Sequence, residues 1–349
     1  MRRAILRGMK RTPWIAILCL GLLRCGGDDA AGGSGGTAGS GGGSGAAAGA
    51  VGSGATAGSG ATAGSGGSAG SAGSSGCGKA APANGKIEIA HGGETRSYQL
   101  HVPKGYDPAK ATPLVMNFHG RTAAALGDAA KNQELVSKLY AKADAAGFVV
   151  VNPQGLTEPD GTQTWNAGLC CAADKSRDDL GFIDAVIDEL QATLCIDTKR
   201  IYATGLSNGG FLSHRLACER SERFAAVAPV AAYNGMPSCN PTRPTPLISF
   251  NGTADPLVGY ASSQSSNQAW VTRNGCNATP TETFKNGDSH CDTYSGCTGG
   301  GEIVFCTVDD GGHTWPGGAD LSVFGFGKTT NDLIANDALW DFFQKHPLP

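Results

Sequence analysis

The strongest local signal runs from residue 200 to residue 218 and reads Arg200-Ile-Tyr-Ala-Thr-Gly-Leu-Ser207-Asn-Gly-Gly-Phe-Leu-Ser-His-Arg-Leu-Ala-Cys218. It begins with a short apolar run that predicts a buried strand, and it ends with apolar residues at helical spacing. Between them, the G-x-S-x-G turn of residues 205–209 places Ser207 at a sharp strand-to-helix bend, with its hydroxyl above the sheet. The turn therefore predicts a nucleophilic serine. The backbone N–H of Asn208, at the helix N-terminus, is predicted to bind a developing oxyanion.

The flanking sequence predicts alternating strands and helices. Strands are expected at residues 86–90 and 96–102 (an edge hairpin), 114–119, 148–151, 225–232, 246–250 and 302–308. Helices are expected at residues 133–146, from 178 to about 194, at 265–273 and at 331–344. Continuous apolar strands that alternate with helices are typical of a mainly parallel α/β sheet with helices on both faces. Ligands of such sheets bind at the carboxyl ends of the strands.

Composition divides the chain into three parts. Residues 26–76 are almost entirely Gly, Ala, Ser and Thr, which predicts a disordered linker because such a segment cannot bury a core. Residues 77–349, about 270 in all, are enough for one sizeable α/β domain. The net charge of −3 comes without a basic stripe or an acidic tail, so the sequence predicts no nucleic-acid partner.

The N-terminus has the features of an export signal. Five basic residues precede an apolar run at residues 14–23 that is too short to span a bilayer. The run ends at Leu22-Leu-Arg-Cys25, which is similar to a bacterial lipoprotein signal in which Cys25 would be lipidated. We therefore expect residues 1–25 to be a signal peptide of the lipoprotein type, with plain secretion as the alternative. In either case we expect the domain to be exported, lipid-anchored at the cell surface or freely secreted. Any membrane contact is expected through this anchor alone.

Ten cysteines remain after the signal segment. An even number in an exported domain favours disulfides. No Cys-x-x-Cys pair or histidine cluster has the spacing of a zinc site, so we predict no metal.

The chain order of polar residues after strands predicts a catalytic triad. A serine nucleophile needs a base, and the base needs a carboxylate that orients it. In the α/β-hydrolase pattern the order along the chain is serine, acid, histidine. His313 lies in a Gly-rich turn after the strand at 302–308, and Asp255 directly follows the strand at 246–250. We predict His313 as the base and Asp255 as the acid, although Asp255 before proline would also suit an Asx-turn.

The competing residues are less well placed. His290 is expected in a polar loop, His346 lies near the chain end, and His214 lies within the helix after Ser207. Asp309 and Asp310 would have to fold back onto His313. A second oxyanion donor is expected in the loop after the strand at 114–119, from the backbone N–H of Arg121 or Thr122.

Several motifs carry a resemblance to a known family. They are Gly205-Leu-Ser207-Asn-Gly-Gly, Gly252-Thr-Ala-Asp255 and Gly311-Gly-His313-Thr-Trp-Pro-Gly. They resemble the secreted carbohydrate esterases of family 1, the feruloyl and acetylxylan esterases, and the related polyhydroxybutyrate depolymerase-like esterases. The similarity runs from about residue 77 to 345. It implies an α/β-hydrolase fold and a serine esterase without cofactor, with Ser207, Asp255 and His313 as its triad. Arg121 departs from the cysteine often found after His-Gly in the depolymerase-like branch.

The resemblance and the chain order together suggest five disulfides. The suggested pairs are Cys77 with Cys195, Cys218 with Cys239, Cys276 with Cys297, Cys291 with Cys306, and the vicinal Cys170 with Cys171.

The resemblance implies an ester substrate on a plant cell-wall polysaccharide, with feruloyl or acetyl esters of xylan as the first expectation. Trp165 and Trp315 could offer flat faces to an aromatic acid or a sugar, or could simply pack their loops, and His119 is a further candidate for lining the site. One alternative is a depolymerase of polyhydroxybutyrate or another polyester. The alternative of another class is a non-catalytic binding domain at the cell surface.

Overall fold

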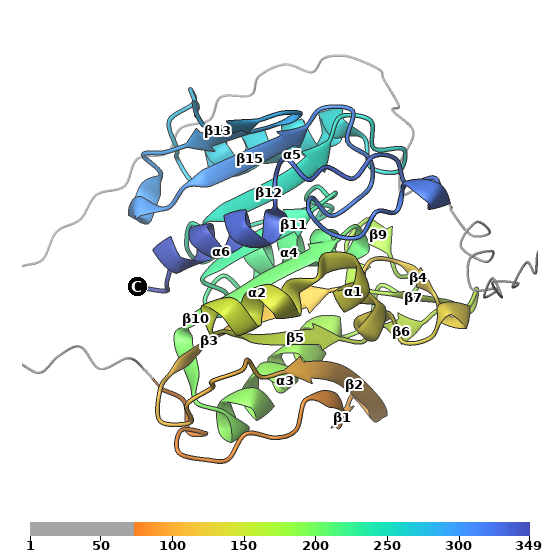
Figure 1. The fold of residues 1–349 in the computed structure, drawn as a ribbon, viewed down its shortest axis with the longest axis vertical. Helices are drawn as coiled ribbons and strands as arrows, with labels where there is room; N and C mark the ends of the chain where they lie inside the picture. Colours follow the sequence, from red (N-terminus) through yellow and green to blue (C-terminus); the bar gives the residue numbers. More distant parts are fainter. Residues whose placement is uncertain (1–72) are drawn as a thin grey trace, which may run out of the picture. The chain divides into compact units, whose positions relative to one another are not determined.

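Ten strands form one central sheet in the computed structural model, which describes residues 73–349. They are β1 Gly85–His91, β2 Glu94–His101, β3 Thr112–Phe118, β5 Val149–Pro153, β10 Ile196–Leu206, β11 Ala226–Val230, β12 Leu247–Gly252, β13 Thr281–Asn286, β14 Ser289–Tyr294 and β15 Ile303–Val308. Their spatial order is β1-β2-β5-β3-β10-β11-β12-β15-β14-β13 (Figure 1). The predicted signal peptide with Cys25, and the predicted linker up to residue 72, lie outside the described residues.

The six central strands, from β5 to β15, run parallel, and antiparallel strands flank them on both sides. Parallel neighbours end at the same edge of a sheet, so the loops that follow β3, β10, β12 and β15 emerge along one edge. This arrangement confirms the predicted α/β-hydrolase fold and sets the position of the site.

Within residues 73–349, six α-helices cover the sheet, and both faces are closed. They are α1 Ala129–Ser137, α2 Leu139–Ala146, α3 Asp179–Thr193, α4 Asn208–Glu219, α5 Tyr260–Arg273 and α6 Ala335–Lys345. Helices α1, α2 and α6 lie on one face, with α3, α4 and α5 on the other (Figure 1). The two apolar cores follow the alternation of strand side chains: Met116 packs in the core under α3 and α4, and its neighbour Val115 packs under α2 and α6.

Short elements build the loops around the carboxyl edge. They are β4 Thr122–Ala123, β6 Leu156–Thr157, β7 Thr162–Thr164, β8 Asn166–Ala167, β9 Cys170–Cys171, and the 3₁₀ turns η1 Ala124–Leu126, η2 Thr298–Gly300 and η3 Ser322–Phe324. No helix within residues 73–349 is both long and apolar enough to cross a bilayer. In the same residues no three His, Cys, Asp or Glu side chains gather as a metal site.

The helix predicted at residues 133–146 is two helices, and this prediction is corrected. Lys138 adopts a left-handed conformation (φ 55°) that separates α1 from α2. The carboxylate of Glu134 accepts hydrogen bonds from the backbone N–H of Tyr140 at 3.1–3.2 Å, so the last turn of α1 caps the start of α2. Burial raises the pKa of Glu134 to about 7.

The polar loop predicted around His290 is a strand, which is a second correction. Strands β13 and β14 form a hairpin closed by Gly287 and Asp288, and His290 lies in β14 opposite Thr307 of β15. The Gly287-Asp288 dipeptide is one of the two-residue turns that indicate a hairpin. The side chains of β13 are almost all exposed, so the apolar alternation that reveals a strand is missing.

A buried ion pair joins β2 to α3, and its loss is expected to be costly. Arg96 Nη2 donates to Asp179 Oδ1 at 3.0 Å, and both side chains are buried; Asp179 Oδ2 also accepts from the backbone N–H of Asn166 at 2.7 Å. We expect Asp179→Ala to lower the free energy of unfolding by about 3–5 kcal/mol, because it leaves the Arg96 charge buried without its carboxylate. The matched control is Asp178→Ala, which removes an exposed N-cap of the same helix and should cost about 1 kcal/mol. Urea unfolding of both variants tests this, and equal losses would contradict it.

Candidate active site

Ser207 occupies the bend between β10 and α4. Its backbone has φ 56° and ψ −122°, an unusual conformation for a residue with a side chain and one that clusters at functional sites. Its N–H donates to the carbonyl of Val230 at 2.9 Å, which ties the bend to the end of β11. The bend needs glycine on both sides, since a Cβ on Gly209 would lie 2.1 Å from the carbonyl oxygen of Phe118, and one on Gly205 2.6 Å from it.

Asp255 and His313 form a buried, hydrogen-bonded pair. Asp255 Oδ2 lies 2.8 Å from His313 Nδ1, and both side chains are less than 5% exposed. The other oxygen, Oδ1, accepts from the backbone N–H groups of Leu257 and Val258, each at 2.8 Å. One oxygen therefore makes an Asx-turn, and the other is hydrogen-bonded to the imidazole of His313.

The competing histidines lie elsewhere. His346 pairs with Glu302, which precedes β15, whereas His313 follows that strand, so His346 is at the opposite edge of the sheet. His214 is buried in α4 and accepts from the indole N–H of Trp270 at 3.1 Å, which makes it a packing residue. Asp255, and neither Asp309 nor Asp310, is the carboxylate bonded to His313.

Ser207, Asp255 and His313 follow parallel strands β10, β12 and β15, and therefore stand at one edge of the sheet. Among residues 73–349 the Ser207 hydroxyl makes no side-chain hydrogen bond, including none to His313. Hydrogen bonds between nucleophile and base are often long before substrate binds, so a missing bond in the free enzyme does not by itself exclude His313 as the base.

The loop after β3 runs beside Ser207. A methyl group built on Gly120 would lie 3.3 Å from Ser207 Cβ and 4.0 Å from its Oγ. The carbonyl of Gly120 accepts two hydrogen bonds, from His119 Nδ1 at 2.7 Å and from Thr122 Oγ1 at 2.9 Å. These two donors lie on the carbonyl side of the peptide bond that joins Gly120 to Arg121. In a trans peptide the N–H points opposite to the carbonyl, so the N–H of Arg121 points away from both donors.

The register of β4 separates the two candidate donors, Arg121 and Thr122. Ala124 N–H donates to the carbonyl of Gly161, and Thr122 is opposite Gln163 in the same antiparallel ladder. Hydrogen-bonded pairs alternate along such a ladder, so Thr122 belongs to a bonded pair and its N–H is used within the ladder. Arg121 is the better placed of the two. Its side chain is directed elsewhere, to an ion pair with Asp160.

The three residues predicted to line the substrate site are buried, and this prediction is corrected. Trp165 and Trp315 are 0% exposed and His119 is 1% exposed, so none offers a face to a ligand. The indole of Trp165 donates to the carbonyl of His119, and that of Trp315 donates to Asn336. These rings pack the loops, as the competing interpretation of the tryptophans allowed.

These buried residues instead brace the bend. The side chain of Asn208 holds the backbone of Trp165 at both ends, accepting from its N–H at 2.7 Å and donating to its carbonyl at 3.1 Å. His119 Nε2 accepts from the backbone N–H of Gly155 at 2.9 Å, which leaves the proton on Nδ1 to reach Gly120. Two loops and the start of α4 are therefore linked by one chain of hydrogen bonds.

Two buried histidines predict how stability depends on pH. Burial lowers the pKa of His119 to about 4 and that of His214 to about 3. Both are neutral in the folded protein, whereas histidine in an unfolded chain takes up a proton below about pH 6.5. These two histidines therefore do not lower the free energy of unfolding above about pH 6.5. As the pH falls from there toward 4, they lower it by an amount on the order of a few kcal/mol.

Urea unfolding at pH 7, 5.5 and 4.5 measures this loss. His214→Gln should lower stability at pH 7 and make its fall with pH shallower. His91→Gln, which changes a partly exposed histidine, should leave the fall unchanged. An unaltered pH dependence in His214→Gln would contradict the prediction.

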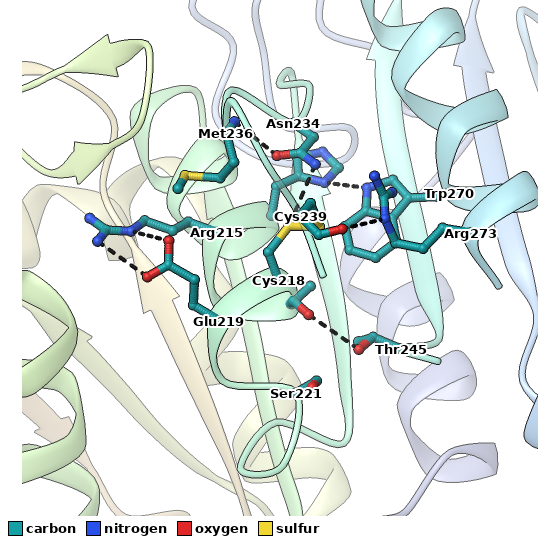
Figure 2. The surroundings of a disulfide bond; sticks show 12 residues. Arg215, Cys218, Glu219, Ser221, Asn234, Met236, Cys239, Thr245, Trp270 and Arg273 are labelled. Atoms are coloured by element: carbon teal, nitrogen blue, oxygen red, sulfur yellow. Dashed lines mark hydrogen bonds and ion pairs between the residues drawn. A yellow bond between two sulfur atoms is a disulfide. The ribbon is translucent and has the colours of Figure 1, made fainter. Parts of the chain in front are cut away.

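All five suggested cysteine pairs occur as disulfides. Cys218, near the end of α4, is bonded to Cys239, and Figure 2 shows this bond beside Trp270 and Arg273 of α5. Cys77 is bonded to Cys195, and the preceding Ser74 also hydrogen-bonds to the backbone of Leu194 and Ile196. The Cys170–Cys171 pair lies close to the bend, with Cys170 Sγ 3.8 Å from Asn208 Nδ2.

Comparison with known proteins agrees with this fold. A family model described as the prolyl oligopeptidase family matches residues 138–236. Feruloyl esterase C of Emericella nidulans is 30% identical over 275 residues, which cover 76% of this chain and 89% of that protein. Feruloyl esterase B of Piromyces equi is 31% identical over 239 residues, 62% of this chain, and the chain spans 42% of that longer protein. Among solved structures, an acetyl xylan esterase from Aspergillus awamori aligns with 69% of this chain and 99% of its own, at 16% identity and a TM-score of 0.50.

Fold and relatives define the class: the protein is a carboxylic ester hydrolase with the α/β-hydrolase fold. Within that class, the chain belongs to the family of the feruloyl esterases.

Proposed function

We propose that this enzyme hydrolyses feruloyl or acetyl esters of plant xylan, outside the cell, through Ser207, His313 and Asp255. The observation that carries the proposal is the buried Asp255–His313 hydrogen bond at the sheet edge where Ser207 occupies its strained bend. The names of the feruloyl esterase relatives support the choice of a feruloyl group. Five disulfides support export, because such bonds persist in oxidising compartments.

The first half of the reaction forms an acyl-enzyme. His313 Nε2 takes the proton of Ser207, and Oγ attacks the ester carbonyl carbon. The negative charge that develops on the carbonyl oxygen is bound by the N–H groups of Asn208 and Arg121. Asp255 holds Nδ1–H and stabilises the imidazolium that forms. The imidazolium then gives its proton to the departing alkoxide, and the alcohol leaves.

The second half repeats these steps with water. His313 takes a proton from the water, the resulting hydroxide attacks the acyl carbon, and the same two N–H groups bind the oxyanion. Collapse of this intermediate releases the carboxylic acid and returns the proton to Ser207. The residues named here supply every proton transfer of the cycle.

A substrate comparison tests the substrate half of the proposal. The full chain is assayed on methyl ferulate, acetylated xylan and polyhydroxybutyrate, with release of acid measured for each. Activity on either of the first two and none on the polyester is expected. Activity on polyhydroxybutyrate alone would overturn the choice of substrate and favour the depolymerase alternative, while leaving the proposed triad to the test in the Discussion.

A further inference from the structure

An aromatic ring lies against the proposed base. The ring of Phe326 is 6.1 Å from the imidazole of His313, centroid to centroid, at an interplanar angle of 27°. The two residues are also joined through the backbone, since the N–H of His313 donates to the carbonyl of Phe326 at 2.6 Å. Unlike Trp165 and Trp315, Phe326 is only partly buried, so part of its side chain is open to solvent.

The base of the loop that carries Phe326 is clamped, while its tip is exposed. The N–H of Gly312 donates to the carbonyl of Lys328 at 2.9 Å, and Lys328 forms an ion pair with Asp288 at 2.6 Å. Gly312 approaches so closely that a Cβ there would lie 2.1 Å from the carbonyl oxygen of Phe326. By contrast, Val323 at the tip is 78% exposed. The backbone at Phe326 is therefore held beside His313, and the tip of the loop carries an exposed apolar side chain.

The chemistry of His313 indicates which half of an ester this ring would meet. In the proposed function, His313 gives its proton to the departing alkoxide, so the alcohol half must lie next to the imidazole. A ring stacked on that imidazole is therefore placed to flank the alcohol half. The C–H face of a sugar and the face of an aromatic ring are both flat and apolar, so they can pack against each other.

We propose that Phe326 is a specificity-determining residue that stacks on the sugar alcohol of the ester. This inference rests on the proposed function, because it takes His313 as the group that protonates the leaving alcohol. In this proposal the accessible ring of Phe326 has the substrate-lining role that the sequence suggested for the two buried tryptophans. The sequence offers one signal for it, an aromatic residue between two glycines, Gly325-Phe326-Gly327, shortly after His313.

Matched esters of one acid test the proposal. Methyl ferulate and feruloyl arabinofuranose share their acyl group and differ only in the alcohol. Phe326→Leu keeps an apolar cover over His313 and removes the flat ring, whereas Phe326→Tyr keeps the ring. For the leucine variant we expect KM for the sugar ester to rise about tenfold with little change in kcat, the size of an ordinary aromatic stacking contact. Both constants for the methyl ester should stay within about twofold, and the tyrosine variant should behave as wild type on both esters.

The outcome separates this role from a merely structural one. If Phe326 only shields His313, the leucine variant will lose kcat equally on both esters or lose nothing, and either result overturns the proposal. Leu135→Ala, which changes an exposed apolar residue on α1, is the matched control and should leave both KM values unchanged. Absence of feruloyl esterase activity would look different, since wild type would then hydrolyse neither ester.

Discussion

Replacing Ser207 with alanine is expected to lower kcat for p-nitrophenyl acetate by about 10⁵–10⁶-fold. The change removes one oxygen atom, the one that we propose attacks the carbonyl carbon. The backbone N–H groups of Asn208 and Arg121 remain, so a small residual rate above that of water is expected. The fold should persist, because the Ser207 side chain makes no hydrogen bond to another side chain within residues 73–349.

Ser213→Ala is the matched control for this prediction. Ser213 lies in the same helix, its hydroxyl donates to the carbonyl of Gly209 at 2.9 Å, and it is buried. It should retain a rate within a few-fold of wild type. Labelling with a fluorophosphonate should add one adduct to the peptide that contains Ser207 in wild type and in Ser213→Ala, and none in Ser207→Ala. An active Ser207→Ala enzyme would end the case for this nucleophile.

Local sequence was sufficient for the elements that position the site. The apolar run before Ser207 and the helical spacing after it are properties of neighbouring residues, and β10 and α4 follow them. The chain order of serine, acid and histidine then placed all three at the carboxyl edge, because parallel strands share that edge. Asp255 was distinguished from Asp309 and Asp310 by its position after β12, and the hydrogen bond to His313 agrees with that choice.

Features that depend on distant partners were missed. Two hydrogen bonds stabilise the break between α1 and α2 at Lys138. The carboxylate of Glu134 accepts from the N–H of Tyr140, and Lys138 Nζ donates to the carbonyl of Gly318, 180 residues away. For the tryptophans the sequence left two roles open, lining the site or packing the loops, because the depth of a ring depends on how loops pack over it. Trp165, for example, is enclosed by Phe118, His119 and Asn208, which come from two other segments. Phe326 was missed for the same reason, since only the folded loop brings it to His313.

Replacing Asp255 with asparagine is expected to lower kcat by about 10⁴-fold with little loss of stability. Asparagine has the same size, and its single oxygen can still accept from the N–H groups of Leu257 and Val258. Its NH₂ group then faces His313 Nδ1 in place of Oδ2. Two donors cannot face each other, so the imidazole would shift its proton to Nε2 and could no longer take one from Ser207.

Asp310→Asn is the control that isolates this effect. Asp310 is also a loop aspartate near His313 in sequence, and its left-handed conformation (φ 56°) is one that asparagine tolerates well. We expect kcat within about twofold of wild type for this variant, because surface substitutions away from a site have small effects. Comparing kcat of the two variants, with urea unfolding to confirm that both fold, tests the assignment. If Asp310→Asn lost the activity and Asp255→Asn kept it, the acid would be Asp310, and the buried Asp255–His313 bond would have a purely structural role.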